Sequence, residues 1–424
     1  MDSTSKKSAR ITVELSSLAS GGSCVGTITA PEELTGKKAF VPYTVPGEAV
    51  EAEVTRSKRS YVEASLVSIQ RPSEKRRQPL CPAFGSCGGC DLQHIDLHEQ
   101  RLLKAEMVEG LLKVHGGVEA EDGISLLAPE LPGFEYRRRM SFHLNKKGEF
   151  GLYRKHGRSI VEISHCPIST PTINAFLSAN LELVRLCAPE IETVTVEDHD
   201  GVVYLALEIH PRNVAGLDTL LPKAAFRELE RRVPNLQVNF RHKAVYRPGV
   251  APGGGPPVGH FSQNNKQAND AMLDFILRHT QTESVTDLFA GAGNISIPLA
   301  LDGHIVTAVE LDPALVAFGK VRAEEAQVGD RLTFHSSGCE KWIESFVPSE
   351  TVVLDPPRSG ALEVCQRLSV GVSPYIVYVS CYPPTFARDV QALVERGYYL
   401  KSVAVLDMFP QTYHSELVAL IEAE

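Results

Sequence analysis

The chain has 424 residues, 43% of them apolar and 22% charged, which is ordinary globular composition but too long for one compact core, so we expect two or three domains. A formal net charge of −9 argues against a nonspecific nucleic-acid binder. The first residues lack the apolar segment of a signal peptide, and no run of about 18 apolar residues occurs, so we expect a cytoplasmic protein with no membrane partner.

Residues 8–70 predict a small β-barrel. Apolar and polar residues alternate with period two in three segments that Gly and Pro separate, for example "RITVELSS" and "SYVEASLVSIQ". Tyr61 and several basic residues on these segments suit the oligonucleotide-binding face of an OB-like barrel. A β-domain that serves only as a spacer is the alternative.

Positive charge is concentrated in two stretches. Seven Lys or Arg occur in residues 56–77, against two Glu, and eight occur in residues 137–158, against Glu149 alone. A phosphate backbone senses such local patches, because screening limits each charge to about 10 Å at 0.1 M salt. The stretches therefore favour contact with nucleic acid, and an ordinary solvated surface is the alternative.

Three cysteines, Cys81, Cys87 and Cys90, occur within ten residues in "PLCPAFGSCGGCDLQH". Disulfides are rare in a reducing compartment, and this spacing around two glycines is typical of a metal centre. The best candidate for a fourth ligand is Cys166, which lies in a Cys-Pro turn. Zinc sites usually combine two C-x2–4-C pairs and only one occurs here, so we favour a [4Fe-4S] cluster, with zinc as the alternative.

The central region, residues 71–260, alternates strand-like segments such as "VVYLALEIH" with predicted helices at 171–187 and near 217–232, and this predicts an α+β domain. A Gly- and Pro-rich segment, "RPGVAPGGGPPVGHFSQNN", then marks a boundary, and a helix is predicted over "KQANDAMLDFILRHT". The third domain accordingly spans residues 261–424.

From residue 284 onward the pattern becomes βαβ. In "SVTDLFAGAGNISIPLA", Gly291 and Gly293 allow close approach to a ligand, and Glu310 at the end of the next predicted strand is placed to accept hydrogen bonds from ribose hydroxyls. The third glycine of the dinucleotide pattern and a Walker-type lysine are missing. We therefore predict S-adenosylmethionine, a cofactor without a pyrophosphate.

Two later strands each end in a polar residue followed by prolines, "VVLDPPRSG" at Asp355 and "YIVYVSCYPP" at Cys381. Strand ends of an open α/β sheet face the ligand crevice, so both side chains are expected there. Methyl transfer to a pyrimidine C5 needs a thiolate that adds to C6 and a base that later removes the C5 proton. Cys381 suits the first role, and Glu416, at the start of the last predicted strand, suits the second.

At this point the sequence resembles the RNA uracil-C5 methyltransferases. The segments "FSQNN", "DLFAGAGNISIPLA", "VVLDPPRSG", "VSCYPPTFARDV" and "DMFPQTYHSE" occur in the order of that family, and the N-terminal region looks like its TRAM domain. The resemblance covers almost the whole chain. It implies three domains: a TRAM-like barrel, an α+β domain with an iron–sulphur cluster, and a Rossmann-like class I methyltransferase domain.

The resemblance also implies individual roles. Cys381 would be the nucleophile, Glu416 the base, and Asp355 the group that recognises the N3/O4 edge of a flipped uracil. The pocket for the cofactor and the target base would be lined by Gln263, Phe289, Gly291, Asn294, Glu310 and Asp355, and the cluster would be held by Cys81, Cys87, Cys90 and Cys166.

Several alternatives stay open on the sequence. The family usually has Asn where this chain has Tyr382, and an apolar residue where it has Ser415. A cytosine-C5 methyltransferase would carry a cysteine within "DPPRSG", and an amino-group methyltransferase would carry an aromatic residue at Arg358. A non-catalytic RNA-binding or redox-sensing protein would not need Cys381, Glu416 and Asp355 together.

Within the family, the cluster together with the barrel points to 23S ribosomal RNA as the substrate, with transfer RNA as the alternative. A loop uridine is expected, because the target base must leave its stack before the thiol can attack it. We expect a monomer.

Overall fold

The structure is a computed structural model that describes residues 9–188, 190–213, 215–247 and 263–423. It divides into two compact units. The first comprises the described part of Met1–Arg76, Asp96–Leu131 and Gln267–Glu424, and the second comprises Arg77–Ile95 and Pro132–Lys266. The domain boundaries at 70 and 260 stay a prediction. Residues 96–131, which lie within the second predicted domain, share a compact unit with the residues after 266.

The predicted N-terminal barrel is confirmed. Its alternating residues form five strands that close in the order β1-β2-β3-β5-β4, with β3 and β5 parallel and the other pairs antiparallel. Val13, Val41, Val50 and Val62 fill the interior and are fully buried. The strands are β1 (Arg10–Leu18), β2 (Ser23–Ala30), β3 (Lys38–Pro42), β4 (Ala49–Ser57) and β5 (Tyr61–Arg71), with a 3-10 turn at Glu32–Leu34.

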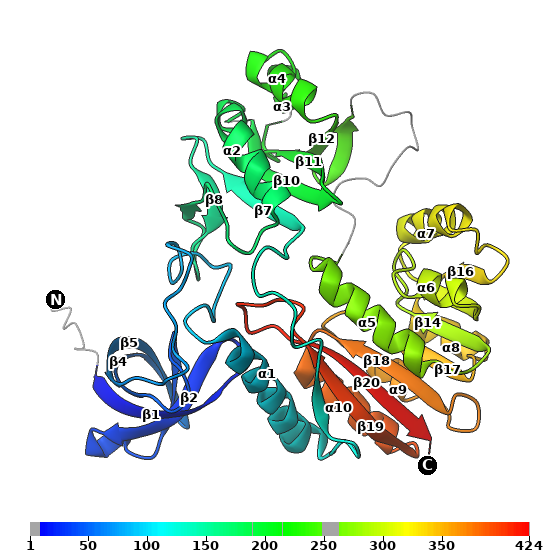
Figure 1. Ribbon diagram of the computed structural model, residues 1–424, viewed down its shortest axis with the longest axis horizontal. Helices are drawn as coiled ribbons and strands as arrows, with labels where there is room; N and C mark the ends of the chain where they lie inside the picture. Colours follow the sequence, from blue (N-terminus) through cyan, green and yellow to red (C-terminus); the bar gives the residue numbers. More distant parts are fainter. Residues whose placement is uncertain (1–8, 189, 214, 248–262, 424) are drawn as a thin grey trace. The chain divides into compact units, whose positions relative to one another are not determined.

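A seven-stranded sheet with helices forms the second unit (Figure 1). Its strand order is β13-β12-β11-β10-β7-β8-β9, and all neighbours are antiparallel except β11 and β12. The strands are β7 (Arg139–Leu144), β8 (Phe150–Tyr153), β9 (Ile160–Glu162), β10 (Ile191–His199), β11 (Val202–Ile209), β12 (Asn235–Phe240) and β13 (Lys243–Tyr246).

The helices of this unit agree with the sequence at one place and differ at another. The predicted helix at 171–187 is α2 (Pro171–Leu186). The helix predicted near 217–232 is two helices, α3 (Gly216–Leu220) and α4 (Ala224–Arg232). Pro222 lies in the break, and because proline lacks an N–H it disrupts a continuous helix. Most of the Gly- and Pro-rich boundary segment lies outside the described residues.

An eight-stranded sheet carries the C-terminal motifs, in the order β16-β15-β14-β17-β18-β20-β19-β6. Strands β14 to β18 are parallel to one another, and β20 is antiparallel to both β18 and β19. Strand β6 forms the edge of the sheet and is parallel to β19. The strands are β6 (Ile124–Leu127), β14 (Ser284–Leu288), β15 (Ile305–Glu310), β16 (Leu332–Ser336), β17 (Thr351–Leu354), β18 (Tyr375–Ser380), β19 (Tyr398–Leu406) and β20 (Glu416–Ala423).

Helices cover both faces of this sheet, as in a doubly wound α/β fold (Figure 1). One apolar core contains side chains of α1 (Leu97–Leu111), α8 (Cys339–Ser345), α9 (Leu362–Cys365) and α10 (Pro383–Val394), and the other contains side chains of α5 (Lys266–His279), α6 (Ser296–Leu301) and α7 (Pro313–Glu325). A short π-helical turn, Leu112–Gly116, continues α1. Among the described residues, no helix is long and apolar enough to cross a bilayer.

Candidate functional site

The three predicted catalytic side chains lie at one edge of the eight-stranded sheet. Strand β17 ends before Asp355, and the neighbouring β18 ends before Cys381. Strand β20 runs the opposite way, and Leu417 pairs with Ser380, so Glu416 at its start faces the same edge. The sheet order thus brings together residues that are up to 61 positions apart, from 355 to 416.

Burial and mutual charge both shift the pKa values of these groups. Burial raises the pKa of Asp355 to about 7. Burial, with the charge of Asp355 adding to it and Arg358 opposing it, raises the pKa of Glu416 well above its usual range. Burial is also the main cause that raises the pKa of Cys381 to about 11, with Glu416 and Asp355 adding to it. At neutral pH the thiol is therefore protonated.

Asp389 anchors the loop that follows β17, and the sequence analysis did not identify it. Its fully buried carboxylate accepts hydrogen bonds from Ala361 N at 2.6 Å and from the Tyr378 hydroxyl at 2.7 Å, and it pairs with Arg388 at 2.7 Å. Gly360 has φ +77°, and a Cβ there would lie 2.4 Å from an Asp389 carboxylate oxygen. The sequence does contain a sign of this role, because Asp389 is an acidic residue on the otherwise apolar, buried face of α10.

The glycine-rich turn after β14 is held to the end of β15. Gly291 N donates to Glu310 Oε2 at 3.0 Å, and Asp312 N donates to Glu310 Oε1 at 2.8 Å. Phe289, Gly291 and Gly293 all have positive φ, of 66°, 57° and 82°. A carboxylate has about four acceptor positions, so Glu310 keeps acceptor capacity for ribose hydroxyls.

Asn294 lies in the same turn, and its side-chain amide exchanges hydrogen bonds with that of Asn269 on α5, at 2.9 and 3.3 Å. Asp287, at the end of β14, is a second residue that the sequence analysis did not identify. It accepts from Ser296 Oγ, and within the described part of the chain its Oδ1 has no hydrogen-bond partner. Burial, with the charges of Asp355 and Glu310 adding to it, raises its pKa to about 7.

Gln263 belongs to the second unit, whereas the other predicted cofactor residues belong to the first. Its neighbours make contacts there: Arg138 N donates to Asn264 O at 2.8 Å, and Asn265 forms a β-bridge with Arg137. A role for Gln263 at the cofactor stays a prediction.

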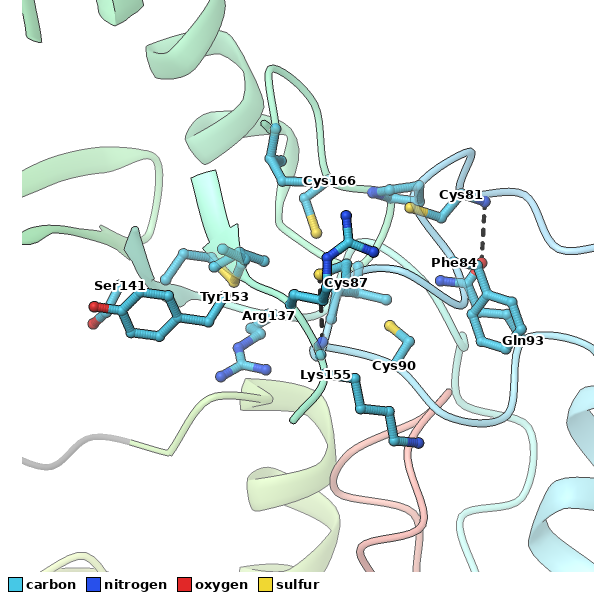
Figure 2. Close-up of a pocket in the computed structure, with 18 of the residues that line it drawn as sticks. Cys81, Phe84, Cys87, Cys90, Gln93, Arg137, Ser141, Tyr153, Lys155 and Cys166 are labelled. Carbon is cyan, nitrogen blue, oxygen red and sulfur yellow. Dashed lines mark hydrogen bonds between the residues drawn. The ribbon is translucent and has the colours of Figure 1, made fainter. Parts of the chain in front are cut away.

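The four predicted ligand cysteines line one pocket of about 540 Å³ in the second unit (Figure 2). Cys87, Cys90 and Cys166 are buried and Cys81 is partly exposed. The loop that carries the first three is held against the sheet, since Gly88 N donates to Tyr153 O at 3.0 Å and Cys87 forms a β-bridge with Arg154. The side chain of Asn174 on α2 fixes the backbone of Cys166. Cys166 N donates to Asn174 Oδ1 at 2.9 Å, and Asn174 Nδ2 donates to Cys166 O at 3.0 Å.

The chemistry of this pocket is set by its four thiols. Burial raises the pKa of Cys90 to about 12, with the three other thiols adding to it, so all four lie near one another. Metal binding displaces such protons. Gly89 N donates to Cys87 Sγ at 3.4 Å, and N–H···S bonds of this kind stabilise cluster sulphurs. No group of three or more ligands in the described ranges is arranged around a single metal ion.

Two family models match parts of the chain. The model described as tRNA (Uracil-5-)-methyltransferase matches residues 342–424, which contain Asp355, Cys381 and Glu416. The model described as TRAM domain matches residues 5–67, which contain the barrel up to the middle of β5.

Known proteins resemble the chain over nearly its full length. It is 31% identical to the 23S rRNA (uracil(1939)-C(5))-methyltransferase RlmD of Shewanella woodyi, with 91% of each chain covered. It is 33% identical to the protein of the same name from Halomonas elongata, covering 92% of this chain and 86% of that one. The fold matches the Pyrococcus abyssi tRNA (uracil-54, C5)-methyltransferase, solved with S-adenosyl-L-homocysteine, with a TM-score of 0.71, 22% identity, and 97% and 99% coverage.

Proposed function

We propose that this chain, which belongs to the RNA uracil-C5 methyltransferase family, methylates a uridine of 23S ribosomal RNA at the position equivalent to 1939. The chain is an S-adenosylmethionine-dependent enzyme with an RNA substrate. The choice of RNA is supported by relatives of that name that align over 91 and 92% of the chain. A transfer RNA uridine is the alternative that the test must separate.

The observation that carries the chemistry is the meeting of a thiol and two carboxyls at the edge formed by β17, β18 and β20. Cys381 Sγ adds to C6 of the flipped uracil, which makes C5 nucleophilic toward the methyl group that S-adenosylmethionine supplies. Glu416 then removes the C5 proton, and the C6–S bond breaks to release 5-methyluridine and the thiolate. Asp355 binds the N3/O4 edge of the base.

The raised pKa values of Cys381 and Glu416 constrain these reaction steps. Cys381 begins as a thiol, so as the S–C6 bond forms its proton passes to O4 of the uracil, where the addition places the electron pair. Glu416, with its raised pKa, is a stronger base once ionised than an exposed glutamate, which suits removal of a proton from carbon. The cofactor is bound by the turn at Phe289, Gly291 and Asn294 and by Glu310.

The cysteine pocket holds a [4Fe-4S] cluster in this proposal, with Cys81, Cys87, Cys90 and Cys166 as ligands. A cluster is preferred to zinc because four-cysteine zinc sites usually combine two C-x2–4-C pairs, and only one such pair occurs here. These four cysteines would hold the cluster, and when bound it would supply a covalent link between residues 81–90 and Cys166, which is a structural role.

The test combines a map of 5-methyluridine with a nucleophile variant. Ribosomal and transfer RNA from cells without the gene are analysed by mass spectrometry, and the 23S modification is expected to be lost while the transfer RNA modification stays. Loss from transfer RNA alone would reject the proposed substrate.

Cys381→Ala is expected to abolish methylation while RNA is still bound, because no other group can add to C6. Cys24→Ala is the matched control, since Cys24 is a buried cysteine of the barrel. Retained turnover in Cys381→Ala would show that Cys381 is not the nucleophile.

A further inference from the structure

The loop between β19 and β20, residues 407–415, leads directly to Glu416 and is buried along much of its length. Loops normally run over the surface, where water satisfies their backbone. Here Asp407, Met408, Gln411, Thr412 and Ser415 are at most 5% exposed. Something other than water must therefore hold this loop.

Helix α1 supplies the partners. Gln100, Arg101 and Lys104 lie on it, and Gln100 and Lys104 are one turn apart on the same face. All three are buried, with exposures of 0, 4 and 0%. Polar side chains of this length are seldom fully buried unless they are paired, and the 407–415 loop provides the pairs.

An ion-pair triad joins α1 to the first residue of the loop. Lys104 Nζ lies 2.6 Å from Asp407 Oδ1, and Arg101 Nε lies 3.3 Å from Asp407 Oδ2. Lys104 Nζ also donates to Phe409 O at 3.3 Å, and the Arg101 guanidinium donates to Pro129 O and Leu131 O. Buried ion pairs contribute little net stability, but they fix geometry, because each charge tolerates few other arrangements.

A second contact fixes the middle of the loop. Gln100 Nε2 donates to Gln411 Oε1, and Gln411 N donates to Gln100 Oε1, both at 3.0 Å. Gln411 has φ +69°, a conformation that non-glycine residues adopt only where surrounding contacts hold it. The two contacts thus fix the loop at 407 and at 411, on the approach to Glu416.

We infer that Gln100, Arg101 and Lys104 are positioning residues for Glu416. Helix α1 holds the 407–415 loop so that the Glu416 carboxyl stays where it can remove the C5 proton. This inference rests on the role proposed for Glu416. It separates the two halves of the reaction, because Cys381 directly follows β18, outside this loop, and its attack on C6 does not depend on α1.

Lys104→Met removes the ammonium group and keeps most of the side-chain volume. We expect kcat to fall about tenfold or more, because small displacements of a catalytic group have large effects on rate, while KM for RNA and for S-adenosylmethionine stays unchanged. The decisive readout is the SDS-resistant complex of enzyme with methylated RNA. It should accumulate, since attachment and methyl transfer proceed and only proton removal is slowed.

Three further variants make the result interpretable. Glu416→Gln should accumulate the same complex, and Gln100→Leu, which leaves the ion pairs intact, should do so to a smaller extent. Lys113→Met is the matched control, because Lys113 follows α1 with an exposed side chain and should behave as wild type.

Wild-type turnover in Lys104→Met and Gln100→Leu would overturn the inference, as would equal losses of turnover and of covalent complex, which indicate a general folding defect. Normal turnover in Glu416→Gln would instead reject the proposed base, and the inference with it.

Discussion

Cys381, the proposed nucleophile, lies in an environment that keeps it protonated. Its pKa of about 11 lies two units above the ordinary thiol value of 9.0, so its thiolate fraction at neutral pH is about a hundredfold lower. Many nucleophilic cysteines are instead activated by nearby positive charge. A thiol that stays protonated until a uracil is bound is protected from unwanted alkylation and oxidation, because the thiolate is the reactive form.

Alkylation kinetics test this state. Without RNA, iodoacetamide should modify Cys381 at pH 8 at least about tenfold more slowly than free cysteine, with a rate that still rises toward pH 10. Asp355→Asn should accelerate the reaction above pH 7, where the wild-type carboxyl is ionised and raises the thiol pKa. The modified peptide is quantified by mass spectrometry. A rate that levels off below pH 8 would contradict the raised pKa.

Tyr382 is the residue at which this chain departs from its family beside the nucleophile. It lies at the N-terminal end of α10 with 37% of its surface exposed, and its N–H donates to Ser380 Oγ at 3.2 Å. An exposed ring next to Cys381 is suited to stack on an unstacked RNA base.

Tyr382→Ala should therefore weaken RNA binding by about 1 to 3 kcal/mol, the usual loss for one base–aromatic stack, whereas Tyr382→Phe should bind as wild type. Tyr375→Ala is the matched control. Tyr375 is also exposed, and it begins β18, so it lies at the end of that strand opposite to Tyr382. Affinity is measured with a ribosomal RNA fragment at fixed salt. Equal binding by Tyr382→Ala and wild type would exclude the stack.

At the scale of elements, one ion pair secures the barrel. Arg76 binds the buried carboxylate of Glu48 with two bonds, of 2.6 and 2.7 Å, and Val45 N and Ser73 N also donate to it. Burial alone would raise the pKa of Glu48, but these partners hold it below its ordinary 4.5. The stabilisation is therefore complete above about pH 4.5 and is lost as the pH falls through the lowered pKa.

Glu48→Gln should lower the free energy of opening of the barrel strands at pH 7 by about 1 to 3 kcal/mol, because it leaves a partly buried guanidinium with a weaker hydrogen-bond partner. The difference from wild type should shrink below pH 4. Hydrogen exchange of peptides from β1 to β5 measures it. Glu51→Gln removes the more exposed pair with Arg10 and should change this energy by less than about 1 kcal/mol.

Period-two and βαβ patterns were sufficient to predict the barrel and the strands that end at Asp355 and Cys381. These features depend on local sequence, in which each strand shows its own apolar run and break. The family assignment also excludes the cytosine-C5, amino-group and non-catalytic alternatives.

The α1 contacts could not be predicted in the same way. The local sequence predicts that Lys104 and Arg101 are exposed to solvent. The carboxylate that allows their burial, Asp407, lies about 300 positions away. Strand β6 was missed for a similar reason: four residues carry little periodicity, and only pairing with β19 makes them a strand.

At the scale of the molecule, the cysteine pocket is lined by both chain segments that make up the second unit. Cys81, Cys87 and Cys90 come from Arg77–Ile95, and Cys166 comes from Pro132–Lys266. A cluster held by all four closes a long loop between them, and closing such a loop lowers the entropy of the unfolded chain.

Protein isolated without oxygen should be brown and contain about four irons per chain. Cys166→Ala should lose iron and open residues 77–95 to proteolysis, whereas Cys187→Ala, a buried cysteine of the same unit outside the pocket, should retain iron. Metal analysis and limited proteolysis check both. Stoichiometric zinc would contradict the cluster.

The pairing of β6 with β19 has a consequence for synthesis on the ribosome. Ile124 pairs with Val403, so β6 emerges long before its neighbour exists. Until β19 and β20 are made, α1 presents its apolar face and its buried cations without their partners. Assembly of this sheet must wait for distant residues, and such long-range closure is slow and exposes the nascent chain to aggregation. A fragment that begins at residue 261 would meet the reverse problem, with β19 as an open edge.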